Sequence, residues 1–151
     1  MNEIEQTKKI LSKLLKDKNN KESIYKWLKS ELSYTSNAIE GNTLTRKETE
    51  LVIEEHLTSS SIPLVYYQEA VNHAKAFLKV LELTKNKTPI TVDIILGLHK
   101  IILTGIDDEN AGFYRNCMVR ISGSRVVLPN PLKVSKLMDD FIGTAALRKK
   151  R

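Results

Sequence analysis

The sequence predicts a mainly α-helical fold: a helical bundle with one β-hairpin inserted late in the chain. In one segment after another, apolar residues recur at spacings of three and four, which is typical of amphipathic helices. Capping residues stand at the expected ends of several of these segments. A short alternating apolar stretch around a glycine predicts the hairpin. With 151 residues, the chain is long enough to bury one core of ordinary size.

Two helices are expected before residue 40. The first, about residues 3–18, places one apolar stripe among lysines, and the second, roughly residues 22–38, follows a break at Asp17–Asn20. Gly41 is well placed to end the second helix in a left-handed C-cap. The two predicted stripes are Ile10, Leu11, Leu14 and Leu15, and then Ile24, Trp27, Leu28, Leu32, Ala38 and Ile39.

Four more helices are expected in the middle of the chain and near its end. Thr45 and Glu48 fit a capping box that opens a helix through about Leu57. A helix near residues 66–84 follows, and Thr91 can cap another that ends at Gly105. Helical spacing returns after residue 131. The predicted buried stripes are Ala70, Val71, Ala74, Phe77, Leu78 and Leu81; Ile94, Ile95, Leu98, Ile101 and Ile102; and Val134, Leu137, Met138, Phe141 and Ala145.

The hairpin is predicted at about residues 117–128. Val119, Ile121, Val126 and Leu128 surround the turn residues Ser122-Gly123-Ser124, and prolines close the segment at residues 129–131.

Composition excludes several classes of protein. No apolar run reaches the roughly 18 residues of a membrane span, and the first residues do not form a signal peptide, so no membrane association is expected. The single Cys117 excludes an internal disulfide and fits a cytoplasmic location. With only His56, His73 and His99 to assist it, at irregular spacing, no metal site is expected. His99 borders an apolar stripe, where a packed, hydrogen-bonded role is favoured over catalysis.

The net charge of +6 does not by itself indicate nucleic-acid binding. Arg148 to Arg151 supply four of these charges, which leaves +2 for residues 1–147. Lysine runs such as those in the first helix are usually solvated faces, and no nucleic-acid-binding motif accompanies them. Nucleic acid is therefore not an expected partner.

Three ordered patterns resemble the Fic family. Residues 36–45, Ser-Asn-Ala-Ile-Glu-Gly-Asn-Thr-Leu-Thr, resemble its inhibitory motif, (Ser/Thr)-x-x-x-Glu-(Gly/Asn). Leu98-His99, followed by Gly112-Phe113-Tyr114-Arg115, is similar to the family's Leu-His and Gly-x-Tyr-Arg. The predicted hairpin looks like the family's flap. On this resemblance, residues 1–34 are N-terminal helices and residues 35–151 are a partial Fic domain.

The resemblance implies a function for each pattern. The family comprises protein adenylyltransferases, which move AMP from ATP to protein hydroxyls. In it, the glutamate matching Glu40 pairs with an arginine of the catalytic loop and occupies the region that the ATP γ-phosphate needs. Ser36 would lie one turn earlier on the same face, and Gly41 and Asn42 would form the turn. The flap, which holds the target by strand-type pairing, corresponds to Val119, Arg120, Ile121, Ser122 and Gly123.

The family's catalytic motif, His-Pro-Phe-x-(Asp/Glu)-Gly-Asn-Gly-Arg, is not found in these 151 residues. No catalytic residue can therefore be assigned. The chain is expected to be truncated before this motif, by a frameshift or an early stop, and to be inactive. No cofactor is expected for it, although the complete family enzyme uses ATP and Mg²⁺.

Other interpretations stay open. The chain could instead be a regulatory module that presents the glutamate helix to a Fic enzyme in trans. The partner of such a module would be a Fic catalytic domain. The partner of the complete enzyme, by contrast, would be a protein target. Without the rest of a Fic domain, uncovered apolar stripes would favour a homo-oligomer. The basic residues at 148–151 are either favourable at a helix C-terminus or unrelated sequence that replaces the family's helix.

Overall fold

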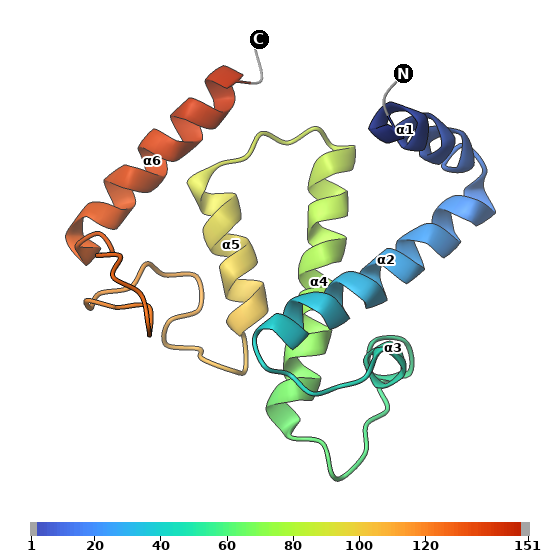
Figure 1. Ribbon diagram of the computed structural model, residues 1–151, viewed down its shortest axis with the longest axis horizontal. Helices are drawn as coiled ribbons and strands as arrows, with labels where there is room; N and C mark the ends of the chain where they lie inside the picture. The colour runs from blue at the N-terminus through green and yellow to red at the C-terminus, as the bar shows by residue number, and fades with distance from the viewer. Residues whose placement is uncertain (1–2, 149–151) are drawn as a thin grey trace. The chain divides into compact units, whose positions relative to one another are not determined.

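The computed structural model describes residues 3–148, with side chains in the last helix as far as Thr144. This part of the chain is mainly helical, as predicted, and contains six helices and no strand (Figure 1). None of its helices is long and apolar enough to cross a bilayer. The basic residues 149–151 lie outside the described residues. The helices are α1 (Glu3–Leu14), α2 (Lys18–Ile39), α3 (Arg46–Glu55), α4 (Leu64–Lys85), α5 (Val92–Leu103) and α6 (Pro131–Arg148).

The chain divides into two compact units. The first runs to Ala74 and the second starts at Lys75, so α4 contributes its first half to one unit and its second half to the other. Residues 34 and 35, between which the resemblance places a domain boundary, both lie inside α2.

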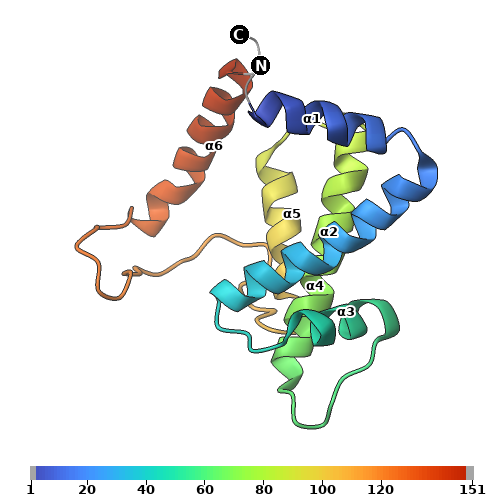
Figure 2. The ribbon, with the colours of Figure 1, turned by 45° about the vertical axis from the view of Figure 1, so that its right-hand side comes forward.

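The first unit packs its core where α3 and the start of α4 meet. In Figures 1 and 2, α2 lies across α4 and α3 lies beside α2. The core cluster consists of Leu44, Val52, Ile53, Ala70 and Ala74, with Ile62, Tyr66, Tyr67 and Val71 packed against it. The predicted burial of Ala70 and Ala74 is confirmed, since their side chains are 0% and 5% exposed.

Local capping chemistry sets the helix boundaries. The predicted capping box of α3 is confirmed: the Thr45 hydroxyl accepts from the Glu48 N–H at 3.2 Å, and the Glu48 carboxylate accepts from the Thr45 N–H at 2.8 Å. Thr91 caps α5 as predicted. Helix α2 starts four residues earlier than expected because the Asp17 carboxylate caps it, accepting from the Asn20 N–H at 2.9 Å.

The expected apolar stripes of the first two helices are wrong in part. Helix α1 buries no residue, and in α2 the side chains of Trp27 and Ile39 are 62% and 84% exposed. The side of α2 that meets α4 carries Ser33, which is fully buried. The helix therefore packs through a small polar residue, and large apolar residues elsewhere on it remain in contact with solvent.

The second unit contains the end of α4, helices α5 and α6, and the long segment of residues 104–130 between them. Helix α5 has no fully buried residue, and Leu137 and Phe141 of α6 are 46% and 59% exposed. The stripes predicted for these helices are thus only partly covered.

The predicted β-hairpin at about residues 117–128 does not form. The segment makes a turn in which the Ser124 N–H donates to the Ile121 carbonyl at 3.1 Å, but no ladder follows. Instead, the Arg115 guanidinium donates to the Cys117 carbonyl at 2.8 Å and to the Pro129 carbonyl, which closes the segment at its base. An isolated pair of strands is marginally stable in water, and the described residues contain no further strand that could support one here.

Candidate regulatory site at the end of helix α2

The residues of the predicted inhibitory motif lie at the C-terminus of α2, where the helix ends in a Schellman motif. Glu40 is the C-cap, and Gly41 follows with a φ of 93°. The Gly41 N–H donates to the Ala38 carbonyl at 3.1 Å, and the Asn42 N–H donates to the Asn37 carbonyl at 3.0 Å. These two bonds, one nested inside the other, define the Schellman motif. The motif favours glycine at its left-handed position. The predicted end of the helix at a left-handed Gly41 is confirmed.

Glu40 projects from this turn into solvent. It is exposed, and within residues 3–148 its carboxylate has neither a hydrogen bond nor an ion pair. A carboxylate at a helix C-terminus adds to the negative end of the helix dipole, so this position costs stability in the isolated chain. The arrangement leaves the charge free to pair with a cation supplied from outside these residues.

Ser36 lies one helical turn before Glu40. Residues four apart share a helix face, and this spacing predicts that the hydroxyl and the carboxylate lie on the same side of α2 and its C-cap. Ser36 is half-buried, and no hydrogen bond of its hydroxyl is found in the described part of the chain. Ser36 thus stands one turn before Glu40, and their shared role in repression stays a prediction.

Asn42 is the most constrained residue of the motif. Its side chain is 7% exposed, and its amide nitrogen donates to the Tyr66 carbonyl at 3.1 Å and to the Glu69 carboxylate at 2.7 Å. Its amide oxygen accepts from the Leu44 N–H at 3.0 Å. The expected turn hydrogen bond is present, and two bonds to α4 accompany it.

A contact between Ser33 and His73, which the sequence patterns did not predict, completes the attachment of α2 to α4. The buried Ser33 hydroxyl contacts His73 Nδ1 at 3.0 Å, and burial lowers the pKa of His73. Glu69 and His73 are four apart on α4, so one face of that helix holds both α2 and the turn after it. A polar pair with this spacing inside a largely apolar helix is the only sequence signal that could have indicated them.

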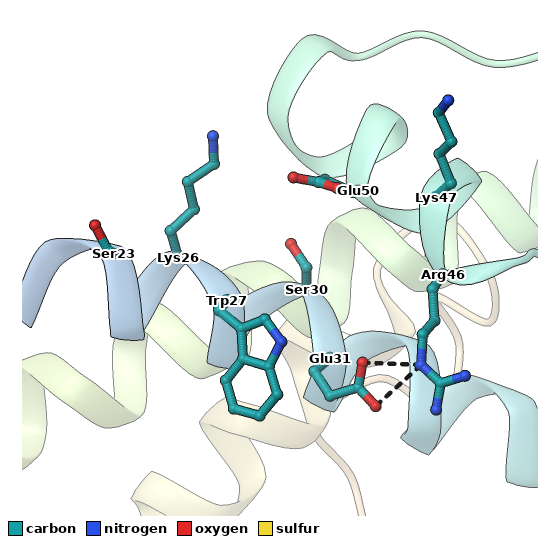
Figure 3. A pocket seen from close by; sticks show the side chains of 8 residues that line it. All are labelled: Ser23, Lys26, Trp27, Ser30, Glu31, Arg46, Lys47 and Glu50. Carbon is teal, nitrogen blue, oxygen red and sulfur yellow. Dashed lines mark hydrogen bonds and ion pairs between the residues drawn. The ribbon is translucent and has the colours of Figure 1, made fainter. Parts of the chain in front are cut away.

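Helices α2 and α3 line a groove of about 630 Å³ (Figure 3). Figure 3 shows that the Arg46 side chain lies against Glu31, and its Nε donates to both carboxylate oxygens at 3.0 and 3.2 Å. The Arg46 guanidinium also lies over the Tyr34 ring, 4.5 Å from its centroid. These contacts fix the start of α3 against α2. The groove residues are Ser23, Lys26, Trp27, Ser30, Glu31, Arg46, Lys47 and Glu50.

The residues assigned to the flap belong to the second unit. Val119, Arg120, Ile121, Ser122 and Gly123 are all exposed and carry no ladder hydrogen bonds. The two arms of residues 117–128 line a hollow of about 380 Å³. These residues thus form an open loop, held at its base by Arg115.

His99 occupies a hydrogen-bonded structural position in the second unit. Its Nδ1 accepts from the Gly112 N–H at 3.1 Å, and this bond links α5 to the following loop. Gly112 has a φ of 84°, and a Cβ there would lie 3.0 Å from the Lys100 Cβ. Gly112 is the first residue of the stretch that resembles the family's Gly-x-Tyr-Arg. Both its positive φ and the closeness of Lys100 favour glycine at this position.

Tyr114 and Cys117 show no arrangement for chemistry. Burial of Tyr114, together with Asp139 and Asp93, raises the pKa of its phenol, which favours the neutral side chain. Cys117 is an exposed free thiol. Among residues 3–148 no group of three histidine, cysteine, aspartate or glutamate side chains could hold a metal ion.

The chain is related in sequence to Fic proteins. Over 109 residues it is 31% identical to the protein adenylyltransferase Fic of Nematostella vectensis, an alignment that covers 72% of this chain and 25% of that protein. It is 30% identical over 108 residues to the protein of the same name from Drosophila grimshawi, covering 72% and 22%. The chain thus spans about a quarter of the length of these relatives. No protein-family model matches it.

Proposed function

We propose that these residues are the N-terminal and middle part of a Fic-type protein adenylyltransferase, in which the end of α2 represses AMP transfer. The sequence relation to proteins of that name supports the family. The observation that carries the repressive role is the exposed, unpaired Glu40 carboxylate at a rigid helix end.

The physical basis of repression is electrostatic. An unpaired carboxylate is available to an arginine near bound nucleotide, and it repels a phosphate group brought to the same place. Ser36, on the same face, helps to fix the geometry of that contact. Residues 119–123 would contact the protein target as an extended loop, which could pair with a strand only on binding.

The 151 residues contain no catalytic motif, so we expect no AMP transfer by this polypeptide alone. In the complete enzyme, ATP and Mg²⁺ would be held by residues outside this sequence. We also place the protein in the cytoplasm, a location compatible with the free thiol of Cys117. The exposed Leu137 and Phe141 favour self-association over nucleic-acid or membrane binding.

Reading the coding DNA beyond the codon for Arg151, in all three frames, tests the proposal that the chain is part of a larger enzyme. We expect a frame that encodes His-Pro-Phe-x-(Asp/Glu)-Gly-Asn-Gly-Arg. Absence of the motif from every downstream frame would contradict this proposal.

The second candidate is a regulatory module that acts on a Fic enzyme in trans. It is favoured by a specific observation: the first unit has its own buried core, and Glu40 of this unit is exposed. Co-elution of the chain with a separate Fic catalytic domain, weakened by Glu40→Gln, would support it. The matched variant Glu50→Gln removes another exposed carboxylate of the same unit and should leave co-elution unchanged.

A further inference from the structure

The side-chain amide of Asn42 is the point at which the end of α2 is attached to α4. Both of its N–H groups are used, one on the Tyr66 carbonyl at 3.1 Å and one on the Glu69 carboxylate at 2.7 Å. The shorter bond has a charged acceptor, and such bonds are stronger than bonds between neutral groups. At 7% exposure, the Asn42 amide is shielded from competing water.

The two acceptors on α4 explain why an amide stands at position 42. An aspartate has the same shape but no donor, and it would place a second carboxylate against Glu69. An alanine would leave the Leu44 N–H without the oxygen that it now meets at 3.0 Å. Only an amide satisfies the carbonyl, the carboxylate and the N–H together.

This attachment holds the backbone turn from which the Glu40 side chain projects. Because the Glu40 side chain has no partner in the described residues, its carboxylate is confined no more tightly than the backbone that carries it. That backbone is held by α2 on one side and by the Asn42 turn on the other. A turn free to rock on its glycine would spread the Glu40 carboxylate over many directions and weaken any contact that requires one of them.

A second contact shows that α4 fixes α2 at two separate points. Ser33 meets His73 nine residues before Asn42, and Glu69 lies one turn before His73 on the same face of α4. The Ser33 contact holds the body of the helix, whereas the Glu69 contact holds the turn beyond its end. Losing Glu69 should therefore loosen the turn without releasing the helix.

We propose that Glu69 is a positioning residue that acts through Asn42 to orient Glu40. The expected effect of Glu69 on AMP transfer rests on the proposed repressive function. Its effect on the turn at Gly41 and Asn42 does not, and can be measured on the 151-residue chain alone.

Amide hydrogen exchange by NMR tests the structural part. The probes are the N–H groups of Gly41 and Asn42, which form the Schellman bonds, and the N–H of Val52 in the core of the same unit serves as the internal control. Glu69→Met keeps the length of the side chain and removes the acceptor, whereas Glu69→Gln keeps an acceptor oxygen.

We expect Glu69→Met to speed exchange at Gly41 and Asn42 by about tenfold, the factor for loss of one hydrogen bond to a charged group. Exchange at Val52 should not change, and Glu69→Gln should restore most of the protection. Unchanged exchange at Gly41 and Asn42 in Glu69→Met would overturn the inference. An equal rise at Val52 would also overturn it, because Glu69 would then stabilise the whole unit.

The functional part is measured as inhibition of AMP transfer by a purified Fic catalytic domain that lacks an inhibitory helix, with radiolabelled ATP. Glu69→Met should inhibit more weakly than the unaltered chain, and Glu69→Gln should inhibit nearly as well. If Glu69→Met inhibits as well as the unaltered chain, the positioning role is wrong. If the unaltered chain and Glu40→Gln both have no effect, repression in trans by this chain has failed, and the exchange data still decide the structural part.

Discussion

The imidazole of His73 lies against the hydroxyl of Ser33, with 3.0 Å between Nδ1 and Oγ, and this contact joins the middle of α2 to α4. Ser33 also donates to the Lys29 carbonyl at 2.7 Å. A hydroxyl has one proton, so the arrangement that satisfies both contacts has His73 donating from Nδ1 to Ser33. The small, fully buried serine allows the helices to approach closely, and the imidazole supplies the hydrogen bond between them.

This contact predicts how stability depends on pH. Burial lowers the pKa of His73, so between the folded and unfolded pKa values the unfolded chain binds more protons. The stability that comes from burying neutral His73 is therefore fully present above about pH 6.5, the ordinary histidine pKa. It is lost as the pH falls toward the lower pKa of His73 in the folded chain.

Urea midpoints measured from about pH 8 to pH 5 should fall less steeply in His73→Gln than in the unaltered protein. The control His56→Asn replaces an exposed histidine with a residue that tolerates its positive φ of 56°, and should keep the original slope. If the urea midpoints of His73→Gln and the unaltered protein depend equally on pH, buried His73 is not the source of the pH dependence.

Two glycines should respond to alanine with opposite signs. Gly41 has a φ of 93°, and a Cβ there would meet no atom within 4 Å, so Gly41→Ala carries only the conformational cost of about 1 kcal/mol. Gly97 lies inside α5, also with open space around it, and Gly97→Ala should stabilise that helix by roughly 0.5–1 kcal/mol. Urea denaturation measures both, and a stabilising Gly41→Ala would exclude the left-handed turn.

The capping box of α3 should be worth about 1 kcal/mol, as is usual for an N-cap threonine. Thr45→Ala should lower the unfolding free energy by that amount in urea denaturation. Thr43→Ala removes an exposed hydroxyl from the same loop that makes no hydrogen bond within residues 3–148, and should be nearly neutral. Similar losses of unfolding free energy in Thr45→Ala and Thr43→Ala would argue against the capping box of α3.

Arg115 should control how open the loop of residues 117–128 is. Arg115→Lys keeps the charge but cannot reach the Cys117 and Pro129 carbonyls together, because a lysine lacks the planar fork of donors. We expect trypsin to cut faster after Arg120 and Arg125 in this variant. Lys133→Arg exchanges one trypsin site for another just outside the loop and is the control. If Arg115→Lys and the unaltered protein are cut at the same rate after Arg120 and Arg125, another contact closes the loop.

The start of α3 and the end of α2 could be predicted from the sequence because the contacts that set them are local. The Thr45 and Glu48 bonds join residues three apart, and the glycine turn after Glu40 needs only a permissive backbone. Helical spacing alone likewise predicts that Ser36 and Glu40 share a face.

The contacts that were not predicted join distant parts of the chain. Asn42 and Glu69 are 27 residues apart, and Ser33 and His73 are 40 apart, so no periodicity brings them together. The hairpin prediction failed because alternation indicates strand preference but not whether partner strands exist. Arg115 bonds to carbonyls at both ends of that segment and closes it without a ladder.

The most direct test of the account is the effect of Glu40 on AMP transfer. The 151-residue chain, Glu40→Gln and the control Glu50→Gln are each titrated into a purified Fic catalytic domain that lacks an inhibitory helix, with radiolabelled ATP and a protein target. We predict that the unaltered chain and Glu50→Gln lower the rate of AMP transfer, and that Glu40→Gln has lost most of this effect. Equal inhibition by Glu40→Gln and the unaltered chain would contradict the repressive role of Glu40.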